Sequence, residues 1–335
     1  MIRVLIAGVI ALVLSTLLGP RFIAFLRRNE FGQHIREEGP ERHVVKQGTP
    51  TLGGLLILMA GSLGFLAASK YTVPALTVFF VTLACGAIGF LDDYIKLTHK
   101  RSLGLNDRWK LLLLGAITID VGIAAQHQNL PTEVYIPGIG ALQLGYAWYG
   151  LLFLVIAGAA NGVNLTDGVD GLAAGTVIIA LFTFAAMNVI AWIRSGPPGH
   201  RFDTKLDLGI IAAALIGGLI GFLWYNAWPA ELFMGDTGSM ALGGALAAFA
   251  IFTQTIFLLL LIGGIFAVSA ISVIIQVFSF KYLGGRRPFL MTPIQHHFEL
   301  KAWSETKIMV RFWIVTGVLC SIGFALYYRY FTGFR

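Results

Sequence analysis

Residues 161–171 read Asn-Gly-Val-Asn-Leu-Thr-Asp-Gly-Val-Asp-Gly and lie between two long apolar runs, residues 147–160 and 172–193. The stretch places two carboxamides and two carboxylates, at a spacing of three, where the chain leaves and re-enters an apolar environment. Polar groups without partners are expensive beside hydrocarbon. Packing alone rarely requires such a set, so the stretch predicts a site at the ends of two membrane-spanning helices in preference to a plain connecting loop.

The composition of the whole chain agrees with a membrane protein. Of the 335 residues, 57% are hydrophobic and 12% are charged, whereas soluble domains contain about 25% charged residues. The 40 glycines fit this class, because small residues let membrane helices approach closely. We therefore expect one all-α, polytopic integral-membrane domain over residues 1–335. Cys85 and Cys320 lie in apolar runs and predict buried thiols without a disulfide.

Apolar runs long enough for membrane helices recur along the sequence. A hydrocarbon core about 30 Å thick needs roughly 20 residues per helix, and about ten runs approach that length. They are residues 1–19, 52–69, 72–91, 110–125, 147–164, 172–193, 207–225, 237–252, 256–279 and 308–329. The first run lacks a cleavage pattern and is followed by its stronger basic cluster, which predicts an uncleaved span with the N-terminus outside.

The basic residues indicate which side of the membrane each connection occupies. Most of them lie in residues 20–51, 92–109 and 280–307, which the alternating spans place on one side. The positive-inside rule makes that side cytoplasmic and puts both termini outside. The net charge of +7 then reflects these loops, and we expect no nucleic-acid partner. On the opposite side, residues 132–144 alternate around Pro-Gly-Ile-Gly and predict a small external β-hairpin.

Two acids, Asp92 and Asp93, close the third apolar run. Adjacent helix residues point about 100° apart, so a division of roles is natural, with one carboxylate toward a metal and one toward a reacting group. Acids at the C-terminus of a helix are disfavoured by the macrodipole. This favours a functional role over a solvated helix end.

A second acidic motif opens the eighth run, where residues 233–239 read Phe-Met-Gly-Asp-Thr-Gly-Ser. Its glycines permit close approach of a ligand, and Asp236 is suited to bind a hard cation. Thr237 and Ser239 can cap the helix or meet phosphate oxygens. The alternative is that Asp236 serves only as a helix cap. The other acids on the same face favour a functional role.

Two further polar segments lie on the same predicted face. Residues 46–54 combine a lysine, hydroxyls and glycines, which suits phosphate contact but also a turn before a helix. Residues 291–300 contain His296 and His297 without the cysteines or spacing of a structural zinc site. The oxygen-rich acids elsewhere favour magnesium. The histidines then suit phosphate contact or proton transfer, in preference to ordinary loop histidines.

These motifs, at residues 92–94, 161–171, 233–239 and 293–301, closely resemble those of the polyprenyl-phosphate N-acetylhexosamine-1-phosphate transferases. The resemblance covers essentially the whole chain and is nearest to the branch that transfers phospho-N-acetylmuramoyl-pentapeptide. It implies a homodimeric enzyme of the bacterial cytoplasmic (inner) membrane with its active site on the cytoplasmic face. Such an enzyme uses Mg²⁺ to transfer phospho-MurNAc-pentapeptide from UDP-MurNAc-pentapeptide to undecaprenyl phosphate, which yields UMP and lipid I for peptidoglycan synthesis.

The resemblance also implies roles for individual residues. Asp236 matches the magnesium ligand, with Asp92 and Asp93 as further candidates. Asp92 matches the acid that either deprotonates the lipid phosphate or attacks directly, and Asp93 matches its required neighbour. The expected substrate-binding positions are Asn164, Asp167 and Asp170 at the nucleoside end, Phe233 stacked on uracil, and the polar residues Lys46, Thr51, Lys110, Asn226 and Gln276.

Gln295 departs from the family pattern, which usually has histidine at this position. A glutamine does not carry a proton near neutral pH. The expected role of Gln295 is therefore a hydrogen bond to phosphate, while His296 and His297 keep the catalytic expectation.

Two alternative functions remain open from the sequence. A sister enzyme would transfer GlcNAc-1-phosphate to the same lipid, but such enzymes carry a differently spaced Arg/His pattern in place of residues 293–301. A secondary transporter would need acids near the middle of the bilayer. Only Asp120 fits that pattern, and we interpret it as a packed or near-interface residue.

Overall fold

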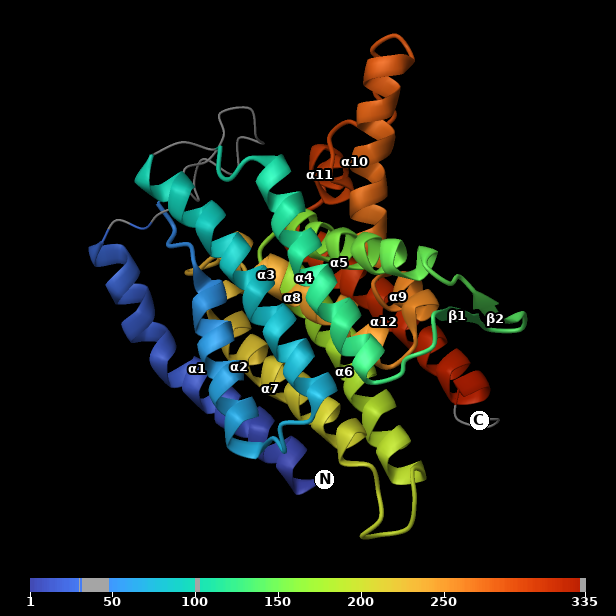
Figure 1. The fold of residues 1–335 in the computed structure, drawn as a ribbon. Coiled ribbons are helices and arrows are strands. Elements are labelled where there is room, and N and C mark those ends of the chain that lie inside the picture. The colour runs from blue at the N-terminus through green and yellow to red at the C-terminus, as the bar shows by residue number, and fades with distance from the viewer. Residues whose placement is uncertain (30, 32–47, 100–102, 332–335) are drawn as a thin grey trace.

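The computed structural model describes residues 1–29, 31, 48–99 and 103–331, which form a bundle of long helices (Figure 1). The helices are α1 (Ile2–Arg28), α2 (Gly53–Ala68), α3 (Val73–Thr98), α4 (Asp107–His127), α5 (Ala147–Thr166), α6 (Leu172–Arg194), α7 (Asp203–Asn226), α8 (Gly235–Phe252), α9 (Ile256–Ile262), α10 (Gly264–Tyr282), α11 (Ile294–Leu300) and α12 (Glu305–Phe331). Apolar segments of this length form helices in a membrane because every backbone polar group must then bond within its own segment.

The structure confirms the expected all-α membrane architecture. Among the described residues, nine helices are long and apolar enough to cross a membrane, and α2 is a shorter apolar helix. Each predicted run corresponds to helix, with one difference. The predicted run 256–279 is divided at Gly263 into α9 and α10, and α10 projects from the bundle in a different direction (Figure 1). The glycine pair Gly263-Gly264 explains the break, because sharp changes of helix direction favour such residues.

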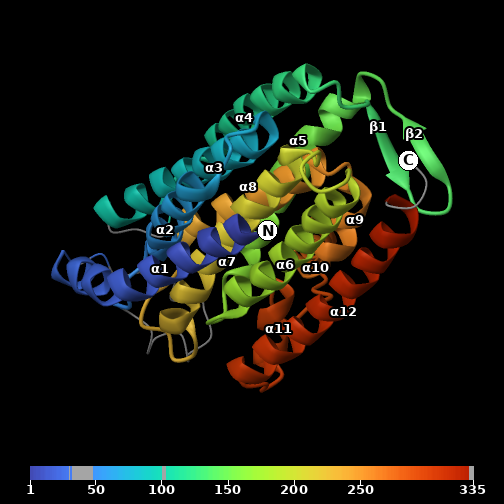
Figure 2. The ribbon, with the colours of Figure 1, turned by 90° about the horizontal axis from the view of Figure 1, so that it is seen from below.

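Helix α8 lies at the centre of the bundle. Every residue from Thr237 to Phe252 is buried, and the end-on view in Figure 2 shows α7 and α8 between α4 on one edge and α12 on another. The sequence of α8 is rich in glycine and alanine, so its neighbours can approach its backbone closely. Its first turn therefore lies deep among the other helices.

Two close approaches bring α3 and α2 to the start of α8. A Cβ atom at Gly89 of α3 would lie 2.1 Å from the carbonyl oxygen of Asp236, and one at Gly54 of α2 would lie 2.1 Å from the nitrogen of Gly238. Only glycine permits these contacts. The start of α2 also bonds directly to the segment before α8, because the amide of Gly53 donates to the Phe233 carbonyl oxygen at 2.8 Å.

The predicted hairpin is confirmed. Strands β1 (Glu133–Ile136) and β2 (Gly140–Gln143) pair antiparallel after α4, with Ile136 opposite Gly140. The hairpin lies at the end of α4 that is remote from Asp107 (Figure 2).

Asp207 of α7 stabilises the connection between α2 and α3. Its buried carboxylate accepts hydrogen bonds from the amides of Lys70 at 2.8 Å and Thr72 at 2.9 Å. A carboxylate at the N-terminus of a helix is favourable. This contact joins the ends of three helices at the end of α3 opposite to Asp92.

Candidate active site

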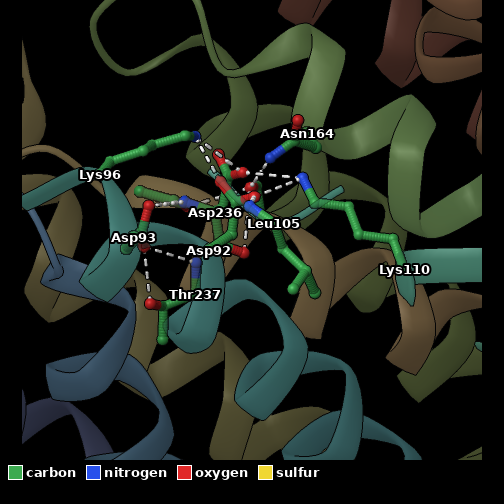
Figure 3. Close-up of polar contacts among 10 residues, drawn as sticks. Asp92, Asp93, Lys96, Leu105, Lys110, Asn164, Asp236 and Thr237 are labelled. Atoms are coloured by element: carbon green, nitrogen blue, oxygen red, sulfur yellow. Dashed lines mark hydrogen bonds and ion pairs between the residues drawn. The ribbon is translucent and has the colours of Figure 1, made fainter. Parts of the chain in front are cut away.

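Three predicted acids meet where α3 approaches the first turn of α8 (Figure 3). One carboxylate oxygen from each of Asp92, Asp93 and Asp236 lies within 4.8 Å of the others. Asp92 and Asp93 are buried and Asp236 is partly exposed. Residues more than a hundred positions apart therefore form one cluster.

Asp93 holds the start of α8. Its Oδ2 accepts hydrogen bonds from the amide of Thr237 at 2.9 Å and from the Thr237 hydroxyl at 2.7 Å. Its Oδ1 accepts from the amide of Asp236 at 3.1 Å. These amides are among the donors that have no partner within the helix at its N-terminus. The negative charge of the carboxylate there also interacts favourably with the helix dipole. Asp93 thus fixes the position of Asp236.

Asp92 is surrounded by positive groups and a backbone amide. Its Oδ1 accepts from the amide of Leu105 at 2.7 Å and lies 2.8 Å from Nζ of Lys110. Its Oδ2 lies 2.6 Å from Nζ of Lys96. Only 1% of the Asp92 surface is exposed, and a Cβ at Gly104 would lie 2.2 Å from its Oδ1. The segment before α4 therefore covers this carboxylate.

The same two lysines reach Asp236. Nζ of Lys96 lies 3.0 Å from Oδ2 of Asp236, and Nζ of Lys110 lies 3.5 Å from the same oxygen (Figure 3). Lys110 was expected at the pocket. Lys96 was not identified as a site residue from the sequence, although it follows Asp92 by four positions, which places both side chains on one helix face.

The donor set of this cluster fits a hard divalent cation. Magnesium prefers oxygen ligands, and carboxylates are its usual protein donors. The lysines show how strongly the cluster attracts positive charge, since the Lys96 ammonium already bridges Asp92 and Asp236. Three carboxylates against two ammonium groups leave a net negative charge for a cation.

The loop at residues 161–171 reaches the same cluster from α5. Nδ2 of Asn164 donates to Oγ of Ser239 in α8 at 2.9 Å. Burial, followed by the nearby carboxylates of Asp236 and Asp93, raises the pKa of Asp167 to about 8. Asn164 therefore bonds to the helix that carries Asp236, and the Asp167 carboxyl lies within electrostatic range of Asp236 and Asp93.

The end of this loop is joined to the segment before α8. Oδ2 of Asp170 accepts from the amide of Ala230 at 3.0 Å. The carboxamide of Asn226 accepts from the amide of Gly171 at 3.1 Å and donates to the Leu232 carbonyl oxygen at 2.9 Å. Asn226 thus connects two backbone segments that border the site.

Helix α11 packs against the other side of the loop. The carboxamide of Gln295 has no exposed surface and donates to the Leu165 carbonyl oxygen at 2.7 Å. His296 lies beside Gly168, and its Nδ1 is paired with Glu299 at 2.5 Å. Gln295 and His296 therefore both contact the polar loop, at Leu165 and beside Gly168.

His297 and Gln276 contact the segment that connects α10 to α11. Nδ1 of His297 accepts from the amide of Leu290 at 3.1 Å, which requires the unprotonated nitrogen. Burial and the charge of Lys301 lower the pKa of His297. The carboxamide of Gln276 makes two bonds to the backbone of Phe289, at 3.0 and 3.1 Å.

Thr51 borders the acids, because a Cβ at Gly235 would lie 3.0 Å from Thr51 Oγ1 and 2.7 Å from Oδ2 of Asp93. Phe233 lies in the segment before α8, and its amide donates to the Pro50 carbonyl oxygen at 2.8 Å. Lys46 lies outside the described residues. Asp120 is exposed on α4, so the interpretation as a packed residue was wrong, and a position near the membrane interface stays a prediction.

Clustered acids and lysines at helix ends place the chain among polytopic membrane proteins that bind charged groups. The family model described as glycosyl transferase family 4 matches residues 75–254. The phospho-N-acetylmuramoyl-pentapeptide-transferase of Rubrobacter xylanophilus is 43% identical and that of Frankia alni 44% identical, each with 98% of both chains aligned. The enzyme of the same name from Geobacillus sp. is 43% identical, with 95% of this chain and 96% of the relative covered. The chain belongs to the phospho-N-acetylmuramoyl-pentapeptide transferases of glycosyl transferase family 4.

Proposed function

We propose that the protein transfers phospho-MurNAc-pentapeptide from UDP-MurNAc-pentapeptide to undecaprenyl phosphate, which forms lipid I and UMP for peptidoglycan synthesis. The near full-length similarity to transferases of that name supports this substrate pair. The observation that carries the proposal is the meeting of Asp92, Asp93 and Asp236 with two lysines in one buried cluster.

The charges of the cluster suit two anionic substrates. A nucleotide sugar and a lipid phosphate repel each other, so bringing them together needs fixed positive groups. Lys96 and Lys110 supply two of these beside the carboxylates. Because each lysine now bridges Asp92 and Asp236, each is placed to move its ammonium toward an incoming phosphate.

Mg²⁺ is the proposed cofactor, held by Asp236 with Asp92 or Asp93 as further ligands. When bound, the ion neutralises phosphate charge and stabilises the charge that develops on departing UMP. The chain itself fixes the position of Asp236, through the bonds from Asp93 to the first amides of α8.

Asp92 is the proposed acid that either removes the proton of the lipid phosphate or attacks the sugar-linked phosphate of UDP-MurNAc-pentapeptide directly, with UMP as the leaving group. Its carboxylate is held by the Leu105 amide and Lys110. Gly104 and Leu105 cover it, so the substrate reaches Asp92 only if this segment moves. Labelled UDP-MurNAc-pentapeptide supplied without lipid acceptor would leave label on the protein only under direct attack.

The nucleoside end is proposed to lie along Asn164, Asp167, Asp170 and Phe233, with Thr51, Lys46 and Lys110 nearby. The carboxamides of Asn226 and Gln276 bond to backbone groups. These two residues suit the shaping of the pocket better than direct contact with substrate. His296 and His297 remain the proposed catalytic histidines, with His296 nearer to the loop.

Purified protein with undecaprenyl phosphate and each of two donors, UDP-MurNAc-pentapeptide and UDP-GlcNAc, tests the proposal. We expect UMP release with the first donor only, and its loss after removal of Mg²⁺ by chelation. Lipid product from UDP-GlcNAc alone would contradict the proposed substrate.

The variants Asp92→Asn and Asp236→Asn test the cluster. Each keeps the size of the side chain but removes its charge, and we expect turnover to fall at least about 100-fold, as for loss of a charge-stabilising group. The variants should remain folded, as measured by thermal unfolding in detergent. Near-normal turnover in both would reject these roles.

The proposed location is the cytoplasmic (inner) membrane, with the active site on the cytoplasmic face. Each chain is proposed to form one integral-membrane domain, and two chains are proposed to form a homodimer. The basic connections near the acids support the orientation. Light scattering of the detergent-solubilised protein measures the number of chains.

A further inference from the structure

Helix α11 presses two polar side chains against the loop at residues 161–171. A Cβ atom at Gly168 would lie 2.7 Å from Nε2 of His296 and 3.3 Å from Nε2 of Gln295. Gln295 also donates to the Leu165 carbonyl oxygen at 2.7 Å. The backbone between Asn164 and Asp170 is therefore in direct contact with α11.

The position of Gln295 excludes the expected phosphate contact in this arrangement. Its side chain has no exposed surface. Its Oε1 accepts from Oγ of Ser269 in α10 at 3.5 Å, while its Nε2 donates to Leu165. A carboxamide carries both a donor and an acceptor. It can therefore join α10 to the polar loop.

His296 is the side chain whose position depends on this attachment. It follows Gln295 in the same short helix, and its Nδ1 is paired with Glu299. The other ring nitrogen, Nε2, is the one beside Gly168. Any displacement of α11 from the loop would move this nitrogen away from the nucleoside end of the site.

We propose that Gln295 is a positioning residue, whose hydrogen bond to the Leu165 carbonyl holds His296 against the loop at Gly168. This inference rests on the proposed function, in which His296 acts on the bound UDP-MurNAc-pentapeptide. Gln295 acts through His296 and does not touch the substrate. A neutral carboxamide keeps this bond at any pH at which the enzyme works.

The variant Gln295→Glu tests the bond with almost no change of shape. It replaces the donor with an oxygen, so two acceptors would face each other in a buried place. We expect kcat/KM for UDP-MurNAc-pentapeptide, measured by UMP release, to fall roughly tenfold or more. Gln126→Glu, at an exposed position near the far end of α4, makes the same chemical change and should stay within about twofold, as is usual for surface substitutions.

Ser269→Ala is a control at the same side chain. It removes the contact at 3.5 Å, which lies at the limit of a hydrogen bond. We expect a change below about threefold, because the shorter bond to Leu165 remains.

A double-mutant cycle separates positioning from general stability. If Gln295 acts through His296, Gln295→Glu should cost less than about threefold in a His296→Asn background, because coupled residues are not additive. An equal loss in both backgrounds would overturn the inference. If the glutamate variant fails to fold, Gln295→Met, which is of similar length and lacks the donor, serves for the same comparison.

The wild-type measurement distinguishes the two proposals. No UMP release from wild-type protein would overturn the proposed function and this inference with it. Wild-type turnover together with near-normal turnover of Gln295→Glu would overturn the inference alone.

Discussion

Asp92 and Asp93 are adjacent in the chain and have different partners. Asp93 accepts from the first amides of α8, whereas Asp92 is held by Lys96, Lys110 and the amide of Leu105. The division follows from helix geometry, because neighbouring side chains point about 100° apart. Asp93 therefore fixes the start of α8, and Asp92 is paired with two ammonium groups.

Lys96 offers a test at this scale. Lys96→Met removes the ammonium that bridges Asp92 and Asp236, and we expect kcat to fall about 100-fold, as for loss of one electrostatic stabiliser. UMP release measures the change. Lys70→Met is the matched control, since its exposed pair with Asp203 lies at the opposite end of α3 and surface pairs contribute little. Equal effects of both substitutions would contradict a special role for Lys96.

Asp167 predicts a pH dependence of stability. Its pKa is about 8 in the folded protein and about 3.9 in an unfolded chain. The folded state therefore binds more protons between these values, so the free energy of unfolding should fall as pH rises from about 4 to about 8. Asp167→Asn should make the unfolding temperature less sensitive between pH 6 and pH 8.5. An unchanged slope in scanning fluorimetry would contradict the raised pKa of this acid.

At the scale of elements, the site depends on how closely α3 approaches α8. Gly89 of α3 allows the contact with the backbone of Asp236. Asp93 of the same helix accepts a hydrogen bond from the Asp236 amide. Residues 161–171, at the end of α5, reach the cluster through the bond from Asn164 to Ser239. Helix α11 contacts these residues through the bond from Gln295 to the Leu165 carbonyl oxygen. In this arrangement, helix ends surround the first turn of a central helix that is buried from Thr237 to Phe252.

Gly89→Ala tests this approach. A new Cβ would lie 2.1 Å from the Asp236 carbonyl oxygen, so we expect a loss of about 1–3 kcal/mol in stability, as for overpacking, with lower activity. Gly158→Ala is the control, because nothing lies within 4 Å of a Cβ there. In that helix alanine should be neutral or stabilising by up to about 1 kcal/mol. Thermal unfolding of both variants measures the difference, and equal stability would reject the close packing.

At the scale of the whole molecule, Asp92 lies beside the segment that begins α4, whereas the β-hairpin follows the other end of that helix (Figures 1 and 2). The basic connections predict that the acidic end faces the cytoplasm. Both natural cysteines are buried, so a single introduced cysteine can report which side of the membrane it occupies.

Ile139→Cys and Leu283→Cys provide this report. Ile139 is 82% exposed in the hairpin and Leu283 is 52% exposed after α10. In intact cells, a membrane-impermeant maleimide should label the first variant, and should label the second only after permeabilisation. The unsubstituted protein, in which both cysteines are buried, should stay unlabelled. The opposite pattern would invert the proposed orientation.

The sequence by itself determined the membrane spans, the hairpin and the candidate acids. These features depend on local properties, namely the length of apolar runs, the alternation of residues and the cost of polar groups beside hydrocarbon. The structure divides the predicted run 256–279 at Gly263 and adds the short helix α11 within the predicted connection 280–307, because helix direction and short helices depend on packing as well as on composition.

The tertiary structure alone decided the partners of the polar side chains. Lys96 joined the acids, and the carboxamides of Asn226, Gln276 and Gln295 turned to backbone groups. The sequence could not assign these bonds, because a buried polar group takes whichever partner the packed helices bring within hydrogen-bond distance. For Asp93 and Thr237 that partner lies 144 positions away along the chain.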